Sequence, residues 1–555
     1  MQKNLIVASL TLIAITSFAD WEFTKIDLNG SQTLVLRDTD QGWAFKASSL
    51  DSNYGIQVGA CIESPTDGRN LDFTGDITNN GSGLPNLQMK IRKIYSPFNN
   101  RWTGASNANA TNLTSIIFPD TLEVIGEFAF WNCTNLTYIS SFPSTILEIN
   151  RGAFENSALA CDIDISEGNC DLGYCAFANT KVTTADLSGV TSIGSHNSYS
   201  GVFENCKSLT SVTLNNSITS IPTRAFKNCS MLTTVTPMLP SSVLNVGEQA
   251  FYNTALTGEL CFESECMLSA GAFAKTKLTA VDLSNTTNVL GVISSSSVVG
   301  VFEDCGDLQS IILPEDLTSI GNNTFYNCTN LVSITPMFPD TLEAFGANAF
   351  GGVTFPEQPL YLRGVKTIGA SVFANQPITE VYFGACLTMI AGGWDKGAFF
   401  NCTKLAKVEF PKNAAPCEFG EMTFAKCSSL KELELPAKSV GRYIITGSGV
   451  TNITYRACLE NFSEKIYTVA YGSQKLTDVY YYGPCPTIDE TVKIFYGINA
   501  GKLTHHVNET YLSTWAAVTD DGEAPDSTSK WITNEAEMWI RPWRPSINST
   551  MIIVK

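Results

Sequence analysis

Apolar residues recur along the middle of the chain with the spacing of short strands separated by turns. Residues 209–214 and 308–313 each place apolar side chains where a strand turns one side inward. A turn at 314–316 and a second apolar pair at 317–320 follow, and the proline in that turn ends strand pairing because it has no N–H to donate. One unit of the chain is therefore predicted to hold two short inward-facing strands joined by bends.

A phenylalanine with a fixed neighbourhood follows these strands. It stands at Phe130, Phe154, Phe177, Phe203, Phe226, Phe251, Phe273, Phe302, Phe325, Phe350, Phe373, Phe399 and Phe424. The intervals of 22 to 29 residues are typical of solenoids, whose units bury their apolar sides only against their neighbours. A second period of 99 residues, for example from Phe226 to Phe325, indicates a duplicated block of four units. We expect parallel sheets along the stacked coils and a buried column of phenylalanines.

The repeat resembles the BspA-like leucine-rich repeat. Residues 313–334 carry the pattern Leu-Pro-x-x-Leu-x-x-Ile-x-x-x-Ala-Phe-x-x-Cys-x-x-Leu-x-x-Ile with one change, Thr324 in place of alanine. The resemblance covers about residues 110–435 and loosely extends to 483. It implies a mostly-β repeat solenoid of the α/β type with right-handed coils, on secreted or surface proteins associated with adhesion to host proteins, extracellular matrix or neighbouring cells. The repeat is specific for the fold and does not identify a ligand.

Both ends of the chain differ from the middle. Lys3, the apolar run 5–15 and the small residues before residue 20 are typical of a signal peptide cleaved after Ala19. We expect a β-rich N-terminal cap at 20–108, the solenoid at 109–483 with degenerate coils from about 436, and a tryptophan-rich C-terminal β tail at 484–555. No later stretch reaches 18 apolar residues, so the mature chain is not expected to span a membrane.

Composition narrows the range of partners. The net charge of −18 argues against nucleic acid or an anionic membrane as partner, because no basic excess is present to neutralise phosphates. With 44% apolar and 16% charged residues, the chain has enough apolar material to fold.

The 17 cysteines of an exported protein suggest disulfides, but seven of them occupy one repeat position. That position holds Cys133, Cys206, Cys229, Cys305, Cys328, Cys402 and Cys427. Other coils have Ser157, Thr180 or Thr254 there, which favours a ladder of buried thiols. The sequence does not decide whether Cys161 forms a disulfide with Cys170 or Cys175, or Cys261 with Cys266. The recurrent asparagines before these cysteines, which also form glycosylation sequons, are interpreted as a hydrogen-bonded ladder that closes each turn.

The sequence predicts no enzyme, no cofactor and no metal site. The only histidines are His196, His505 and His506, and none has a catalytic setting. The adjacent pair points to opposite sides of a strand, which disfavours a shared metal. Glu432 and Glu434 alternate with leucines on a repeat strand, where a solvated outward side is the ordinary explanation of paired carboxylates.

What remains as a candidate site is the outward side of the first strand of each coil. We predict a binding face formed by Thr210, Ser211, Thr213, Gln309, Ser310, Glu380, Tyr382, Lys407, Glu409, Lys431, Glu432 and Glu434. Its expected partners are extracellular or cell-surface proteins. Two alternatives stay open: glycan binding through Trp515, Trp531, Trp539 and Trp543 of the tail, and a purely structural surface component without a specific ligand.

Overall fold

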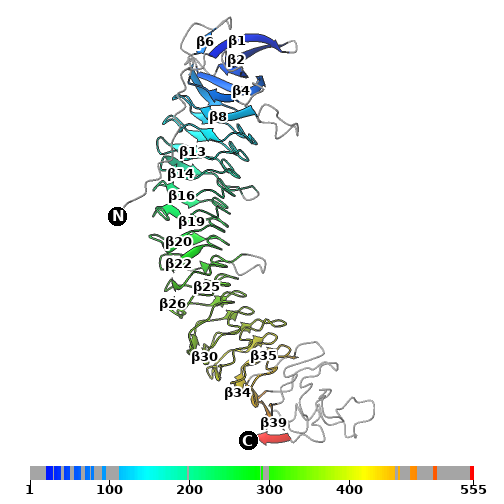
Figure 1. Ribbon diagram of the computed structural model, residues 1–555. Coiled ribbons are helices and arrows are strands. Elements are labelled where there is room, and N and C mark those ends of the chain that lie inside the picture. Colours follow the sequence, from blue (N-terminus) through cyan, green and yellow to red (C-terminus); the bar gives the residue numbers. More distant parts are fainter. Residues whose placement is uncertain are drawn as a thin grey trace, which may run out of the picture. The chain divides into compact units, whose positions relative to one another are not determined.

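The chain folds as a mostly-β parallel solenoid, as the sequence predicts. The computed structural model describes residues 21–28, 31–38, 43–49, 55–63, 69–74, 77–79, 90–95, 112–196, 199–287, 289–291, 299–456, 461–462, 475–483, 504–508 and 551–554. Within these residues there is no helix, and strands of successive coils stack on one another through each unit (Figure 1). The expected signal peptide and the four tail tryptophans lie outside the described residues.

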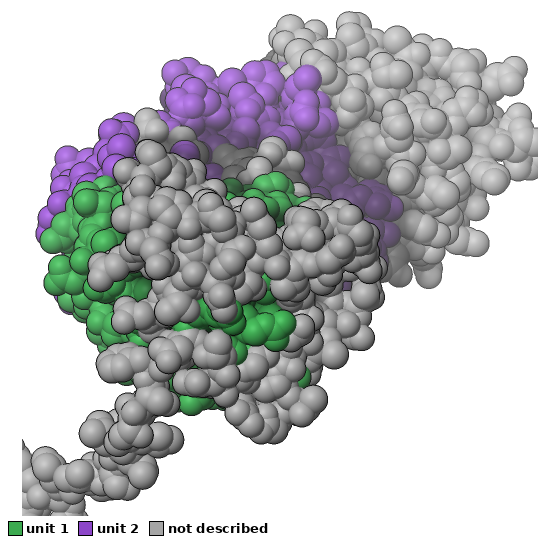
Figure 2. Space-filling model, turned by 90° about the horizontal axis from the view of Figure 1, so that it is seen from above, with its two compact units in different colours: residues 1–218, 224–240 green, residues 219–223, 241–555 purple. Residues whose placement is uncertain are grey.

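The solenoid divides into two compact units, which are coloured separately in Figure 2. Unit 1 contains residues 1–218 and 224–240, and unit 2 contains residues 219–223 and 241–555. In each unit a coil contributes one strand to a first face and one to a second face. The first face carries the strands whose outward positions form the predicted binding face.

In unit 1 the first face holds two sheets. Their strands, in spatial order, are β10 (Tyr138–Ile139), β8 (Leu113–Ile117) and β5 (Arg69–Asp72), then β12 (Ile163–Asp164), β14 (Thr184–Leu187), β16 (Ser211–Leu214) and β18 (Thr234–Thr236). The second face is a ten-stranded sheet of β15 (Val190–Ile193), β13 (Cys170–Leu172), β11 (Glu148–Ile149), β9 (Val124–Ile125), β7 (Lys90–Ile94), β4 (Gly55–Glu63), β3 (Ala44–Ser49), β2 (Ser31–Asp38), β1 (Trp21–Leu28) and β6 (Ile77–Asn79).

In unit 2 the first face holds three sheets. They are formed by β20 (Thr257–Cys261), β22 (Lys277–Asp282), β24 (Ser310–Ile312) and β26 (Ser333–Thr335); by β28 (Leu360–Leu362), β30 (Glu380–Phe383) and β32 (Lys407–Glu409); and by β34 (Glu432–Leu435), β36 (Asn452–Tyr455), β38 (Asp478–Tyr481), β39 (Thr504–Asn508) and β40 (Met551–Val554). The second face contains β17 (Ser220–Ile221), β19 (Asn245–Val246) and β21 (Met267–Leu268), and then β23 (Val289–Leu290), β25 (Ser319–Ile320), β27 (Ala344–Phe345), β29 (Thr367–Ile368), β31 (Met389–Ile390), β33 (Cys417–Phe419), β35 (Ala437–Val440) and β37 (Asn461–Phe462).

The parallel ladders reach further along the chain than the clear repeat pattern does. At the N-terminal end, β1 to β4 pair antiparallel, and β4 then pairs parallel with β7. β5 also pairs parallel with β8, so coil-like pairing begins before residue 109. At the other end, β39 and β40 continue the parallel ladder of β38 beyond residue 483.

The first described strands close over apolar side chains. Trp21 and Trp43 are wholly buried, and the Trp21 ring stacks on Phe73 with 5.5 Å between centroids. Each indole N–H also finds a backbone carbonyl, Trp21 that of Asp72 at 2.9 Å and Trp43 that of Asn70 at 3.2 Å. A buried indole needs such a partner, so these contacts fix the antiparallel strands on the first coil.

The column of phenylalanines is confirmed. In unit 1 the rings of Phe130, Phe154 and Phe177 lie 5.2 and 5.3 Å apart and nearly parallel. In unit 2 Phe325 stacks on Phe302 at 5.6 Å and on Phe350 at 5.3 Å, and all three rings are fully buried. Because these rings contact one another from coil to coil, the column forms within each unit the apolar core that single coils lack.

The repeated asparagines and cysteines form the ladders that the sequence suggests. Asn228 has φ of 62°, a left-handed conformation that asparagine tolerates better than most residues, and its amide donates to Asn205 Oδ1 at 2.9 Å. Buried Cys229 donates to the carbonyl of Phe203 in the preceding coil at 3.1 Å. Where Thr180 replaces the cysteine, its hydroxyl donates to the carbonyl of Phe177 at 2.8 Å. At these coils the repeat position therefore holds a small hydrogen-bond donor rather than a disulfide.

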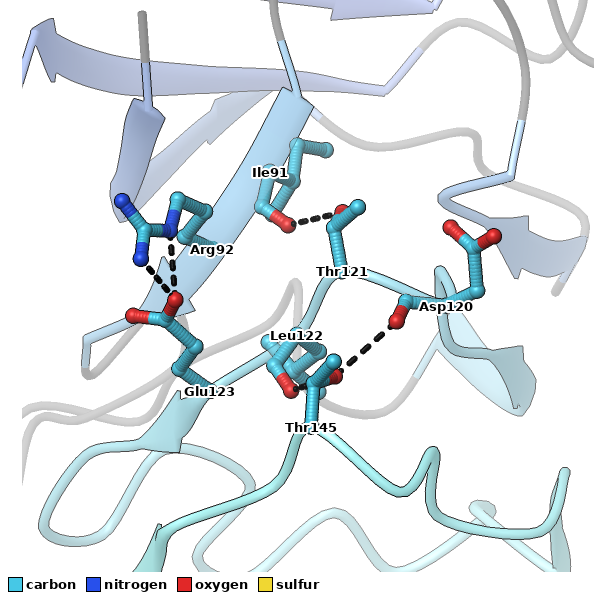
Figure 3. A network of polar contacts seen from close by, with 7 residues as sticks. All are labelled: Ile91, Arg92, Asp120, Thr121, Leu122, Glu123 and Thr145. Carbon is cyan, nitrogen blue, oxygen red and sulfur yellow. Dashed lines mark hydrogen bonds and ion pairs between the residues drawn. The ribbon is translucent and has the colours of Figure 1, made fainter. Parts of the chain in front are cut away.

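Threonines in the turns tie neighbouring coils together. Figure 3 shows Thr121 donating to the carbonyl of Ile91 at 2.9 Å, and Thr145 donating to those of Asp120 and Leu122 at 2.9 and 2.7 Å. In unit 2 Thr341 makes the same kind of contacts. These bonds satisfy carbonyl groups at bends, where strand pairing ends.

Candidate binding groove

The structure places the predicted face residues on the first face but does not gather all of them. Those on or beside β16, Thr210, Ser211 and Thr213, lie in unit 1 and are half-buried. Gln309 and Ser310 lie at β24, and Glu380 and Tyr382 on β30. Because the first face is divided into separate sheets, the predicted residues do not form one continuous ladder.

Five of the predicted residues do meet, in a groove of about 800 Å³ in unit 2. The groove runs over β32, β34, β36 and β38. Its lining residues are Ala406, Lys407, Val408, Glu409, Phe410, Pro411, Lys412, Lys431, Glu432, Leu433, Glu434, Asn452, Thr454, Arg456, Tyr480 and Tyr482. The strands present alternate residues outward, so Leu433 is buried beneath Glu432 and Glu434, which are exposed.

The groove lies where the ladder of the first face is interrupted. β32 is the last strand of one sheet and β34 the first of the next. Pro411 follows β32 closely and cannot donate a ladder hydrogen bond. Instead, the Arg456 guanidinium donates to the carbonyl groups of Pro411 and Phe410 at 3.0 and 3.3 Å, and it also pairs with Glu434. The hydrogen bond to Glu434 raises the pKa of Arg456, so this lining residue of the groove stays charged.

Lys407 is held by its neighbours. Its Nζ lies 2.6 Å from Glu409 Oε2, 3.3 Å from the Tyr382 hydroxyl and 4.8 Å from the centre of the Tyr382 ring. The hydrogen bond to Glu409 is the main cause of its raised pKa, followed by the bond to Tyr382. Tyr382 donates in turn to Glu380, which raises the tyrosine pKa. The positive charge of Lys407 is therefore already paired with the carboxylate of Glu409.

Three charges of the groove have no such partner. Within the described residues, no ion pair involves Lys412, Lys431 or Glu432, and all three are exposed. Tyr480 and Tyr482 line the groove from β38 and the residue after it, and Tyr482 is 40% exposed. Burial raises the pKa of Tyr480, so its hydroxyl stays protonated. Charged and hydrogen-bonding groups are therefore available to a ligand.

A second aromatic feature borders the groove. The Tyr361 and Tyr382 rings, on paired strands, stack at 5.0 Å with an angle of 11°. The Arg363 guanidinium carbon lies 5.4 Å from the centre of the Tyr361 ring, and Lys407 Nζ lies 4.8 Å from the centre of the Tyr382 ring. Each tyrosine of the pair thus makes a cation–π contact, while Tyr361 stays 49% exposed.

Sequence reasoning missed several groove residues. Lys412, Arg456, Tyr480 and Tyr482 lie in turns or in the degenerate coils after residue 436, where the repeat pattern no longer gives the register. Tyr361 could have been found, because it occupies on β28 the outward position that Tyr382 occupies on β30.

Other candidate chemistry has clear places in the structure. Cys161, Cys170, Cys261 and Cys266 are thiols, and the Cys175 thiol donates to the carbonyl of Ser200 at 3.0 Å, so no disulfide of the suggested pairs is present. His196 is exposed and packs against the rings of Tyr174 and Tyr199, which stack on each other. His505 and His506 lie on β39. Across the described part of the chain, no group of three or more potential ligands could hold a metal, and no helix could cross a bilayer.

Coils of two short strands, a phenylalanine column and an asparagine ladder together define a parallel leucine-rich-repeat solenoid. The chain belongs to the family with a BspA type leucine rich repeat region, whose profile matches residues 105–200, 196–298, 293–416 and 393–514. Comparison with curated protein sequences finds no match.

Solved structures of leucine-rich-repeat and surface proteins are similar to the chain at low identity. A leucine-rich repeat protein from Bacteroides ovatus is 19% identical with a TM-score of 0.45, covering 71% of this chain and 94% of its own. A leucine rich cell surface protein from Faecalibacterium prausnitzii is 21% identical with a TM-score of 0.29, covering 80% and 94%. The pneumococcal vaccine antigen PcpA is 13% identical with a TM-score of 0.27, covering 94% and 98%.

Proposed function

We propose that this protein is a secreted or cell-surface, non-catalytic adhesion protein that binds extracellular protein partners in the groove over β32, β34, β36 and β38. Its family fits a binding or adhesion role. The observation that carries the proposal is the meeting of exposed charges and tyrosines from four successive first-face strands in one groove. Repeat solenoids use such extended strand faces to bind other proteins.

The groove is suited to binding because part of it is fixed before a partner arrives. Arg456 and Lys407 are held by several contacts each, so little side-chain freedom is lost there on binding. Lys412, Lys431 and Tyr482 are exposed and available for direct contact. Held residues beside exposed ones favour a groove that recognises a specific partner over a surface that serves only to keep the protein soluble.

The test is surface plasmon resonance of the purified protein against a panel of extracellular matrix proteins. We expect saturable binding to at least one of them. The triple variant K412A/K431A/Y482A should weaken that binding at least tenfold without changing the circular dichroism spectrum, since interface centres concentrate binding energy in a few residues.

The control is the variant E418A/K438A, which removes an exposed ion pair of 3.2 Å from the second face. It should bind as the parent does. Equal binding by both variants would move the site away from the groove, and absence of binding to every panel member would overturn the adhesion role.

A further inference from the structure

The groove has an excess of positive charge on a strongly acidic protein. It is lined by four cations, Lys407, Lys412, Lys431 and Arg456, and by three carboxylates. The chain as a whole carries −18. A local positive excess against that background attracts anionic groups more selectively than the rest of the surface does.

The ion pairs inside the groove decide which cations a ligand can use. Lys407 is paired with Glu409, and Arg456 with Glu434. A ligand that took either cation would have to break an existing pair, and the net gain would be small. Lys412 and Lys431 gain a partner without losing one, and Glu432 is the single carboxylate left to oppose an anion.

The positions of the two available lysines suit an elongated ligand. Lys431 comes immediately before β34, whereas Lys412 lies in the turn beyond the end of β32. They are therefore offset along the strand direction by the length of a short strand. Side chains on one side of an extended peptide recur every two residues, about 6.6–6.8 Å apart, and reach both positions within one segment.

The aromatic rings favour a polypeptide over a carbohydrate. Sugar rings stack on open aromatic faces, but the neighbouring Tyr361 and Tyr382 stack on each other, and each also has a cation near its ring, although Tyr361 is 49% exposed. Tyr482, which is 40% exposed, offers one ring beside hydrogen-bonding Asn452 and Thr454. Such a wall suits the side chains and amide groups of an extended chain.

We propose, resting on the adhesion function above, that the groove recognises an extended acidic segment of its partner, whose carboxylates pair with Lys412 and Lys431. Glu432 opposes these carboxylates and limits affinity. Lys407 positions the groove wall and does not contact the acidic side chains.

The probe is a fluorescein-labelled dodecapeptide of alternating Glu and Thr, titrated with the full-length protein and followed by fluorescence anisotropy. Matched peptides with Gln or Lys in place of Glu are the controls for charge. We expect binding of the Glu peptide alone, and weaker binding as NaCl rises from about 0.05 to 0.5 M, because exposed charges are screened.

The variants separate the roles of the lysines. K412Q and K431Q should each weaken binding of the Glu peptide about two- to fivefold, and the double variant about tenfold, as expected for exposed ion pairs. E432Q should strengthen binding by a similar factor, and K407Q should leave it within twofold. Equal losses for K407Q and K431Q would overturn the assignment of the lysines.

Two further outcomes also overturn the inference. Equal binding of the Gln peptide would show that the groove does not distinguish charge. Binding of labelled heparin at protein concentrations where the Glu peptide does not bind would assign the groove to a sulfated glycan. If a matrix protein still binds in a groove-dependent manner while the Glu peptide does not, the acidic-segment inference fails and the adhesion function stands.

Discussion

Replacing Phe325 with alanine tests whether the phenylalanine column holds the coils together. The ring is fully buried and contacts Phe302 on one side and Phe350 on the other. The cavity cannot close easily, because the backbone N–H of Phe325 is bonded to the carbonyl of Ala349 at 2.9 Å and Cys328 is bonded to that of Phe302 at 3.1 Å. We therefore expect a loss in the upper part of the usual range for Phe→Ala, about 4 kcal/mol.

The loss should be local, because coils contact only their neighbours. Hydrogen exchange followed by mass spectrometry measures it: about 4 kcal/mol corresponds to roughly a thousandfold faster exchange of protected amides. The change should be confined to about residues 300–350. Phe325→Leu keeps apolar volume and loses the ring stacking with both neighbours, so it should cost about 1–3 kcal/mol.

The adjacent Tyr326 provides the control. It is 41% exposed, and Tyr326→Ala should cost less than about 0.5 kcal/mol, as surface substitutions usually do. The reasoning is refuted if Phe325→Ala accelerates exchange less than tenfold, or if both variants give the same acceleration.

Three further predictions concern the ladders and the groove. Burial raises the pKa of Cys206 to about 11, so its thiol stays protonated at pH 8 and should resist iodoacetamide in the folded protein, while exposed Cys386 is labelled. The contribution of buried Cys206 to stability is full below pH 9 and should fall as pH rises towards 11. Asn228→Gly loses the side-chain contacts, including the hydrogen bond to Asn205, whereas Asn228→Ala loses them and also strains a φ of 62°, so alanine should lower the melting temperature more. Arg456→Gln should speed hydrogen exchange at residues 410–416 and weaken partner binding; unchanged exchange there would refute its bridging role.

The sequence predicted well those features that depend on local pattern. Spacing alone located the phenylalanines, and substitution of Cys by Ser or Thr at one position indicated buried thiols rather than disulfides. The alternation along residues 432–435 correctly predicted that Glu432 and Glu434 face outward and Leu433 faces inward. Strand phase follows directly from residue order, so no tertiary information was needed.

The groove could be predicted only in part. Lys407, Glu409, Lys431, Glu432 and Glu434 were recognisable as outward residues, but their meeting in one groove depends on the break between β32 and β34. That break involves Arg456, which is 45 residues from Pro411, and a contact of that separation has no signal in a single sequence. Likewise, the distances between side chains decide which lysines form ion pairs.

By itself, the sequence determined the repeat, the mostly-β coil, the buried column and the outward side of each strand, because a periodic pattern imposes the same local environment in every coil. The tertiary structure alone decided where the sheets of the first face are interrupted, which charges pair and which stay available. These depend on how neighbouring coils stack, and a small departure from the repeat, such as Pro411 with Arg456, changes that stacking without disturbing the pattern around it.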